Sequence, residues 1–344
     1  MAFTPGPHDP AVWDDLLSTT MHNYRSTLTD NVFDSRPGLN YFKEKGRVRY
    51  VDGGISIVEP LLVAEGESGS YTEWQQLTIN PQQGISAAQF PWRQLYATIA
   101  ISGLEEAQNN GKAAAINLLE AKVTQAEQTL QNRLSGQIWG SIPGYNAAVD
   151  FGSLQALIDS TTMVGGIDPA ADPANGFWSS VEVNATATPY TAASYEAALR
   201  NAYNTTSDSG SDRIDALFGG QGTFEFYEST LTPQVRYTDT SKANLGFQNL
   251  MFKGVPFYWD FDVPAGMVFG INSKYVSLVI HSQRNFAQTK FTSGLGENVG
   301  GTPSSTTGAG TSIDARYSFI TLYGNMTIRN RRRNFKIWGI SEAP

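Results

Sequence analysis

The pattern of apolar and polar positions predicts one long amphipathic helix within residues 103–140. Apolar side chains recur there in steps of three or four. They are Ile116, Leu119, Val123, Ala126, Leu130, Leu134 and Ile138. This spacing places them along one side of a helix and leaves polar side chains on the other faces. No proline interrupts the stretch, and a helix over residues 112–138 would be about 40 Å long at about 1.5 Å per residue.

The shorter apolar runs of residues 46–102 are typical of β-strands. A polar, turn-rich stretch at residues 65–70 separates two strand regions, and the second is expected to return through Trp74, Leu77 and Ile79. The segment is therefore predicted to be an extended β-hairpin. A two-stranded ribbon is marginally stable alone in water, so we expect its apolar side chains to pack against another body, such as a second subunit.

The remaining segments alternate between turns, short strands and one short helix. Residues 1–45 contain four prolines and are expected to form an irregular N-terminal arm. A helix is expected at residues 191–203. Strands are expected at residues 214–218, 250–252, 255–259, 267–271 and 275–281. The chain is expected to close with a hairpin of residues 317–328 and 335–340, joined by a turn at 329–334.

Composition narrows the range of functions. The net charge of −8 argues against bulk attraction to nucleic acid. The absence of cysteine excludes disulfides, thiolate catalysis and cysteine-based zinc sites. The N-terminal residues lack the basic and apolar regions of a signal peptide, and no apolar run is as long as a membrane span. We therefore expect neither export by the classical route nor a membrane partner.

Few residues suggest chemistry. The three histidines, His8, His22 and His281, have no spacing typical of a metal site or a catalytic triad. Asp260 and Asp262 could hold a cation or act as a glycosidase carboxylate, although such acids are more commonly solvated. No cofactor, metal or catalytic residue is predicted.

One basic cluster stands out near the C-terminus. It comprises Arg329, Arg331, Arg332, Arg333 and Lys336. These side chains could contact a neighbouring subunit or nucleic-acid phosphates, or could simply be solvated. We interpret them as a candidate intersubunit or DNA-facing basic patch.

The order of the parts resembles that of the major capsid proteins of tailed bacteriophages, which have the Hong Kong 97-like fold. The resemblance covers nearly the whole chain by organisation. The sequence segments that carry it are VEPLLVAEGESGSYTEW (residues 58–74), the predicted helix with its lead-in Ile101-Ser102-Gly103, Lys253-Gly254-Val255-Pro256-Phe257, and Asp262-Val263-Pro264-Ala265-Gly266-Met267 followed by the strand at Tyr275.

This resemblance implies an α+β fold with five parts. They are an N-terminal arm at residues 1–45, an extended hairpin loop at 46–102, a spine helix of the peripheral domain at 103–140, an axial domain at 141–266, and peripheral-domain strands with the C-terminus at 267–344. It also implies self-assembly through pentamers and hexamers into an icosahedral shell around double-stranded DNA, with no enzymatic activity. The location would be the virion, after assembly in the host bacterial cytoplasm.

Partners are expected from the same resemblance. They are other copies of the chain, a portal, a decoration protein, packaged DNA in non-specific contact and, since the arm is short, either a separate scaffolding protein or none. Two alternatives stay open. One is a carbohydrate-binding or carbohydrate-active β-rich protein that would use its Trp and Tyr side chains with Asp260 or Asp262. The other is a different virion component, such as a tail-tube or decoration protein.

Overall fold

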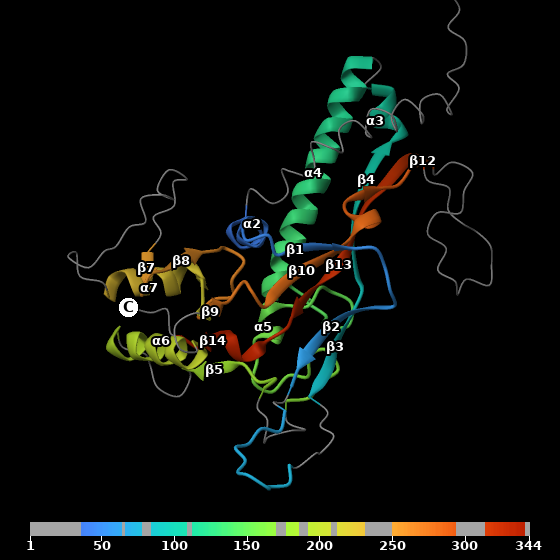
Figure 1. The fold of residues 1–344 in the computed structure, drawn as a ribbon. Helices are drawn as coiled ribbons and strands as arrows, with labels where there is room; N and C mark the ends of the chain where they lie inside the picture. The colour runs from blue at the N-terminus through green and yellow to red at the C-terminus, as the bar shows by residue number, and fades with distance from the viewer. Residues whose placement is uncertain are drawn as a thin grey trace, which may run out of the picture. The chain divides into compact units, whose positions relative to one another are not determined.

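The computed structural model describes residues 36–63, 66–77, 84–108, 112–169, 177–185, 192–207, 212–230, 250–293 and 314–340. It contains both helices and sheets (Figure 1). The chain divides into two compact units, each described here by itself. The described part of the first unit is drawn from residues 94–134 and 281–323, and that of the second from residues 36–93, 135–280 and 324–340.

The long helix predicted from the apolar periodicity is confirmed. It is α4 (Lys112–Trp139), which has 28 residues. The predicted apolar positions whose side chains are described are all buried. They are Leu119, Val123, Ala126, Leu130, Leu134 and Ile138. The period of 3.6 residues thus identified the packed face of the helix correctly.

The first unit joins part of α4 to β-strands. Its elements are β4 (Arg93–Ser102), α3 (Gly103–Gln108), η3 (Ser282–Arg284), β11 (Ala287–Gln288), β12 (Thr292–Ser293) and the first part of β13 (Ala315–Ile328). β13 pairs with β4, β11 and β12. The side chains of β4 alternate strictly, because Leu95, Ala97, Ile99 and Ile101 are buried while the residues between them are exposed.

The second unit contains a six-stranded sheet in the order β5-β14-β9-β6-β8-β7. Its strands are β5 (Val181–Asn184), β6 (Ala216–Gly219), β7 (Leu250–Phe252), β8 (Val255–Trp259), β9 (Val268–Ile271) and β14 (Phe335–Trp338). Helices α6 (Ala192–Thr206) and α7 (Gln221–Thr230) pack against β5, β14 and β8. Phe257, Leu217 and Phe335 belong to the buried core that these elements share.

The other elements of the second unit are α2 (Pro37–Glu44), β1 (Val48–Val51), β2 (Ser56–Leu62), β3 (Ile85–Pro91), α5 (Leu154–Leu157), β10 (Val276–His281) and η4 (Arg331–Arg333). β10 pairs antiparallel with the last part of β13, from Val276 opposite Ile328 to Ile280 opposite Gly324.

The helix expected at residues 191–203 is confirmed as α6, and the strands expected between residues 214 and 281 are confirmed as β6 to β10 with small shifts at their ends.

The predicted closing hairpin is wrong. β13 and β14 follow each other in sequence but do not pair, because β14 lies between β5 and β9 in the other sheet. The connecting segment is not a tight turn but η4, whose Arg331 is buried. Gly270 on β9 explains the choice of neighbour: a Cβ at this position would lie within 2.4 Å of the Phe335 ring, so only glycine admits that ring.

Two further expectations need correction. Residues 37–44 are not irregular, because Pro37 begins the helix α2, whose Leu39, Tyr41 and Phe42 are buried. The return strand of the hairpin does not pass through Trp74 and Leu77, since both lie in a non-strand segment and the strand begins at Ile85. Ile79 and residues 1–35 lie outside the described residues. The five-part division of the chain stays a prediction.

Candidate intersubunit surface

The hairpin of β2 and β3 has one buried and one exposed face. The two strands pair antiparallel from Ser56 opposite Pro91 to Leu62 opposite Ile85. Ile57, Leu61 and Phe90 point to the buried face together with Glu59 and Ala88. Because side chains alternate along a strand, the residues between them share the opposite, exposed face.

That exposed face is largely apolar, and we call it the apolar hairpin face. Its apolar members are Val58, Pro60 and Leu62 on β2 with Ile85 and Ala87 on β3, and the polar Gln89 shares this face opposite Val58. Leu62 and Ile85 face each other and are each 80% exposed, and Val58 is 51% exposed. Contiguous exposed apolar side chains of this kind typically mark an interaction site. An exposed hydrophobic strand pair is also a template for association.

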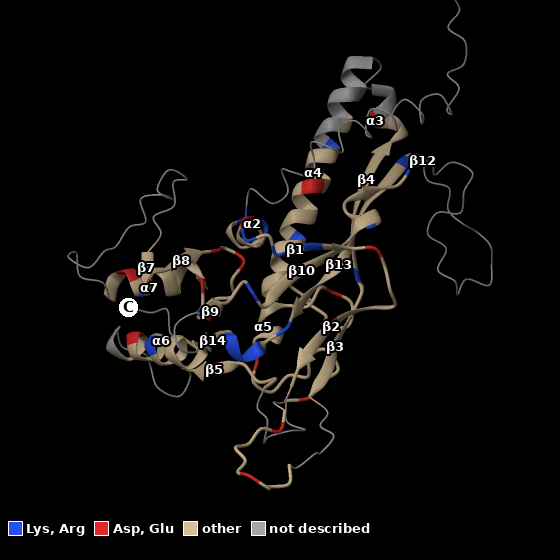
Figure 2. Ribbon diagram, in the orientation of Figure 1, with Lys and Arg blue, Asp and Glu red and all other residues tan. Residues whose placement is uncertain are grey.

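The described part of the segment that joins the two strands, residues 66–77, continues the same character, and we call it the hairpin tip. Tyr71 and Leu77 are mostly exposed, and Trp74 is fully exposed. Trp74 adopts a left-handed backbone with φ of 67°, a conformation that is uncommon for a bulky residue. The tip carries Glu67 and Glu73 but no lysine or arginine, and Figure 2 shows its charges as acidic only. The tip therefore presents aromatic and acidic groups to solvent.

The carboxylate of Glu59 lies on the buried face of the hairpin and anchors it through hydrogen bonds. Glu59 lies between Ile57 and Leu61 on β2 and has a side chain that is 1% exposed. Arg49 Nη1 donates to its Oε1 at 2.5 Å, and Arg329 Nε donates to its Oε2 at 2.7 Å. Thr327 Oγ1 donates to Oε1 at 3.3 Å. A buried charge must be paired and hydrogen-bonded to be tolerated, and these three donors meet that need. They join β2 to Arg49 on β1, to Thr327 on β13 and to Arg329 just after β13.

The basic cluster is divided between buried and exposed positions. Arg331 is fully buried, and its guanidinium donates to backbone carbonyls rather than facing solvent. Its Nε donates to Leu157 O at 2.9 Å, its Nη1 to Thr162 O at 3.0 Å and its Nη2 to Asp159 O at 2.6 Å. Burial lowers the pKa of Arg331 to about 10, and the nearby Asp159 carboxylate acts in the opposite direction. The side chain therefore stays charged at neutral pH.

Lys336 is also buried. Its Nζ lies 2.8 Å from Asp159 Oδ2 and 3.4 Å from Glu182 Oε1. Burial acts to raise the pKa of Asp159, but hydrogen bonds from Lys336 and from the backbone N–H groups of Thr161 and Thr162 lower it below its ordinary value. Arg333 is half-buried, donates to Thr206 O at 3.3 Å and lies 3.8 Å from Asp212.

Arg329 and Arg332 are the exposed members of the cluster. Arg329 keeps its contact with Glu59 at 2.7 Å. The structure therefore brings the five basic side chains to one stretch, beside β14 in Figure 2, but it gives most of them partners within the chain.

Asp260 and Asp262 are tied to α2. Asp260 is buried and accepts a hydrogen bond from Gly38 N at 2.9 Å and from Trp139 Nε1 at 3.2 Å, both at Oδ2. Burial raises the pKa of Asp260 and its hydrogen bonds oppose this rise. Asp262 forms an ion pair with Arg36 at 3.3 Å. The Asp260 carboxylate anchors a helix and is closed to a ligand from solvent.

Other candidate chemistry is sparse in the described part of the chain. His281 Nδ1 accepts a hydrogen bond from Gln283 N at 3.2 Å, whereas His8 and His22 lie outside the described residues. Among the described residues, no three His, Cys, Asp or Glu side chains gather as a metal site would require. No helix in the described ranges is long and apolar enough to cross a membrane.

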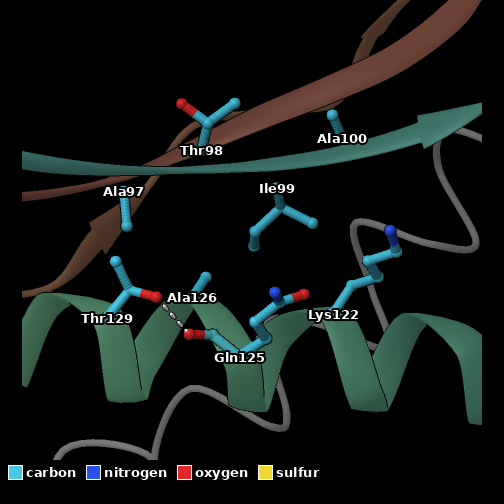
Figure 3. A pocket seen from close by; sticks show the side chains of 8 residues that line it. All are labelled: Ala97, Thr98, Ile99, Ala100, Lys122, Gln125, Ala126 and Thr129. Carbon is cyan, nitrogen blue, oxygen red and sulfur yellow. Dashed lines mark hydrogen bonds between the residues drawn. The ribbon is translucent and has the colours of Figure 1, made fainter.

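A hollow of about 250 Å³ lies between β4 and α4 within the first unit. Ala97 and Ile99 point from the strand toward the helix, while Lys122 and Gln125 come from the helix (Figure 3). Thr129 Oγ1 donates back to Gln125 O at 2.8 Å, and Lys122 lies 3.7 Å from Glu105. These polar groups are engaged by the chain itself, so the hollow shows no convergent binding chemistry.

The roles of Glu59 and Arg331 were not predicted from the sequence. Glu59 has the same alternation as Ile57 and Leu61, so the period of two already placed it on the buried face. That burial requires a cationic partner, and the cluster at residues 329–336 could have supplied one. The burial of Arg331 had no such local signal, because its acceptors are backbone carbonyls distant in sequence.

Comparison with known proteins gives no match by sequence. No family model matches the chain, and no curated protein matches it. Solved structures do match over most of its length. The capsid asymmetric unit of cyanophage A-1(L) has 17% identity and a TM-score of 0.59, and the match covers 87% of this chain and 93% of that one.

Two other capsid structures are similar. The capsid of a native GTA particle has 11% identity and a TM-score of 0.58, with 86% of this chain and 89% of that one covered. The procapsid of satellite phage P4, described with a size determination (Sid) protein, has 12% identity and a TM-score of 0.50 over 98% of this chain and 93% of that one. This chain has the fold of phage major capsid proteins.

Proposed function

We propose that the chain is a major capsid protein of a tailed bacteriophage with the Hong Kong 97-like arrangement of arm, extended loop, spine helix, axial domain and peripheral domain. Copies of it assemble through pentamers and hexamers into an icosahedral shell around double-stranded DNA. The role is structural and not enzymatic. The observation that carries the proposal is the apolar hairpin face, which needs a partner and belongs to a chain with a capsid fold.

The apolar hairpin face leaves apolar side chains in contact with water. Transfer of apolar surface out of water contributes roughly 25 cal/mol per Å², and Leu62 and Ile85 are 80% exposed at directly opposed positions. A second copy of the chain is the natural cover, because a shell repeats the same contact at every subunit. Many modest contacts repeated by closed symmetry give a stable assembly.

We propose the following further partners. The P4 procapsid contains a size determination protein, and a separate scaffolding protein is proposed to guide this chain in a comparable way. A portal and a decoration protein complete the shell. Assembly takes place in the host cytoplasm and the mature protein resides in the virion. The exposed Arg329 and Arg332 are proposed as the part of the basic cluster that contacts a neighbouring subunit or packaged DNA.

The proposal is tested by placing charge on the apolar hairpin face. Leu62→Asp combined with Ile85→Asp should leave the subunit folded, because both side chains are exposed. It should prevent closed shells, because two carboxylates would be buried at every contact without partners. Negative-stain electron microscopy and sedimentation of the co-expressed capsid and scaffolding proteins measure this outcome.

Leu104→Asp is the matched control. Leu104 is 67% exposed on α3 and lies outside the hairpin. Shells that form normally with Leu104→Asp but not with the double variant support the proposal. Normal shells from the double variant would contradict it.

A further inference from the structure

The described part of the loop between α5 and β5, residues 158–169 and 177–180, contacts the hairpin within the second unit. Gln89 on β3 donates its backbone N–H to Gly165 O at 2.9 Å. Val164 and Ile167 exchange backbone hydrogen bonds of 3.2 and 3.1 Å, which closes a tight turn around Gly165 and Gly166. This turn is therefore joined to the outer edge of β3 by a backbone hydrogen bond.

Gly165 approaches β3 closely. A Cβ on Gly165 would lie 2.7 Å from the Cβ of Ala88, which is fully buried. Gly166 has a similar left-handed backbone, with φ of 78° against 63° for Gly165, but a Cβ there would meet nothing within 4 Å. The two glycines therefore share a backbone requirement, and only Gly165 has a steric one.

The buried guanidinium of Arg331 binds the backbone of this loop. Its guanidinium donates to the carbonyls of Leu157, Asp159 and Thr162, which together span the start of the loop. The same guanidinium lies 5.9 Å from the centre of the Trp178 ring. Trp178 Nε1 in turn donates to Val164 O at 2.8 Å. Arg331 is therefore connected to β3 through Trp178, Val164 and the turn at Gly165.

Four backbone carbonyls accept from this one planar group, because Nη2 also donates to Ala156 O at 3.5 Å. These hydrogen bonds fix the orientation of the guanidinium and of the carbonyls. The fork of N–H donors on arginine is rigid and always charged, whereas the lysine ammonium is a compact group with freely rotating donors. Ser160 donates through its N and Oγ to Glu182 Oε2, at 3.2 and 2.7 Å, and so secures the outer side of the loop to β5. The described part of the loop is held by Arg331 and by Glu182, and its turn at Gly165 contacts β3.

We propose that Arg331 is a positioning residue for the hairpin. It fixes residues 158–167 of the loop, and through Gly165 the loop fixes β3 and the direction in which the apolar hairpin face is presented. This inference rests on the proposed function of that face as a subunit contact. It assigns to Arg331 a role inside the subunit rather than a direct contact with a neighbour or DNA.

Hydrogen exchange on the unassembled full chain tests the proposal. Arg331→Lys keeps the charge but loses the rigid fork, so exchange in the peptide that contains Gln89 should become about five- to tenfold faster, as expected for the loss of about one hydrogen bond. A peptide from β9, in the core sheet, should keep its wild-type rate. Gly165→Ala should have the same effect as Arg331→Lys, while Gly166→Ala should not.

The double variant with Arg331→Lys and Gly165→Ala sharpens the result. If both changes act through the same contact, its exchange near Gln89 should match that of the single variants rather than their product. A wild-type rate near Gln89 in Arg331→Lys would overturn the proposal. So would a rise that occurs equally in β9, since that reports general destabilisation.

Assembly is scored separately by sedimentation of the same proteins. A wild-type chain that never forms shells would refute the proposed function while leaving the exchange result at Gln89 to decide the role of Arg331. Faster exchange near Gln89 together with fewer or misshapen shells is the result expected if both are correct.

Discussion

The hairpin of β2 and β3 differs from the six-stranded sheet of the second unit in how completely its side chains are buried. In the sheet, every residue of β6 and β9 is buried, and helices α6 and α7 pack against it. In the hairpin, only alternate residues are buried, and the other face carries Val58, Leu62 and Ile85 in solvent. Both regions are rich in apolar side chains, but only the sheet has a complete core.

This difference separates stability from assembly. Side chains in the sheet contribute to folding because they leave water when the subunit folds. Side chains on the apolar hairpin face gain little from folding and would gain on association. Substitutions in the two regions should therefore change different measured quantities, and the following predictions rank them by their effect on the free energy of unfolding.

The largest effect is expected in the sheet. Phe269 on β9 is fully buried against Trp139, with ring centroids 5.5 Å apart. Phe269→Ala should lower the free energy of unfolding by about 4 kcal/mol, because it leaves a cavity in a packed core. Chemical denaturation of the unassembled subunit measures this loss. A change below about 1 kcal/mol would mean that the sheet is not the stable core described here.

An intermediate effect is expected from the buried ion pair of the loop. Asp159→Asn removes the nearer carboxylate from Lys336 and leaves Glu182 at 3.4 Å. The cost at pH 7 should be about 2 kcal/mol, less than for a buried charge that loses its only partner. Denaturation of the wild type and the variant at the same pH gives this difference.

The pH dependence gives that variant a second test. The pKa of Asp159 is lowered in the folded protein, so the folded state binds this proton less tightly than the unfolded chain. Its stabilising contribution is present above the unfolded pKa of about 3.9 and is lost as the pH falls below that value. The gap between wild type and Asp159→Asn should therefore shrink from pH 5 to pH 3. A constant gap would argue against the ion pair.

A smaller effect of opposite sign is expected on α4. Burial raises the pKa of Glu127 to about 7, and its Oε1 is buried without a hydrogen-bond partner among the described residues. The folded state binds this proton more tightly, so stability from this group is present below about pH 4.3 and is lost as the pH rises through 7. Glu127→Gln should stabilise the subunit at pH 8 by about 1 kcal/mol after solvent screening.

Thermal unfolding at pH 4 and pH 8 measures the Glu127 effect. Most of the gain should be lost at pH 4, where the carboxyl group is neutral in the folded state and mostly neutral in the unfolded state. Equal stability of the two proteins at pH 8 would show that Glu127 is as well solvated in the folded subunit as in the unfolded chain.

The smallest effect on stability is expected on the hairpin. Leu62→Ala should change the free energy of unfolding by less than about 0.5 kcal/mol, because the side chain is 80% exposed. The same change should reduce the yield of shells measured by sedimentation. A large loss of stability with normal shells would reverse the comparison between hairpin and sheet.

The spacing of apolar residues along the sequence was enough to predict many of the helices and strands of this fold. The spacing of Leu119, Val123 and Leu130 identified the packed face of α4, and the apolar run at residues 276–280 identified β10. The same rules missed α2, because one proline and eight residues give a weak helical signal. They also favoured a hairpin for β13 and β14, since neighbours in sequence usually pair, whereas Gly270 makes room for Phe335 in another sheet.

The candidate surface could be predicted only in part. A hairpin with apolar side chains that need a partner follows from the alternation of residues 57–62 and from the instability of isolated ribbons. The fate of the basic cluster could not be predicted, because a run of arginines looks the same whether it is solvated or buried. Arg331 is buried since backbone carbonyls of residues 157–162 converge on it, and that convergence exists only in the folded chain.

The most direct test of the account is a cryo-electron microscopy reconstruction of the particles formed when the chain is co-expressed with its scaffolding partner. We expect a closed icosahedral shell in which Leu62 and Ile85 of each subunit are covered by a neighbouring copy. Monodisperse single subunits, or a shell that leaves the apolar hairpin face in solvent, would contradict it.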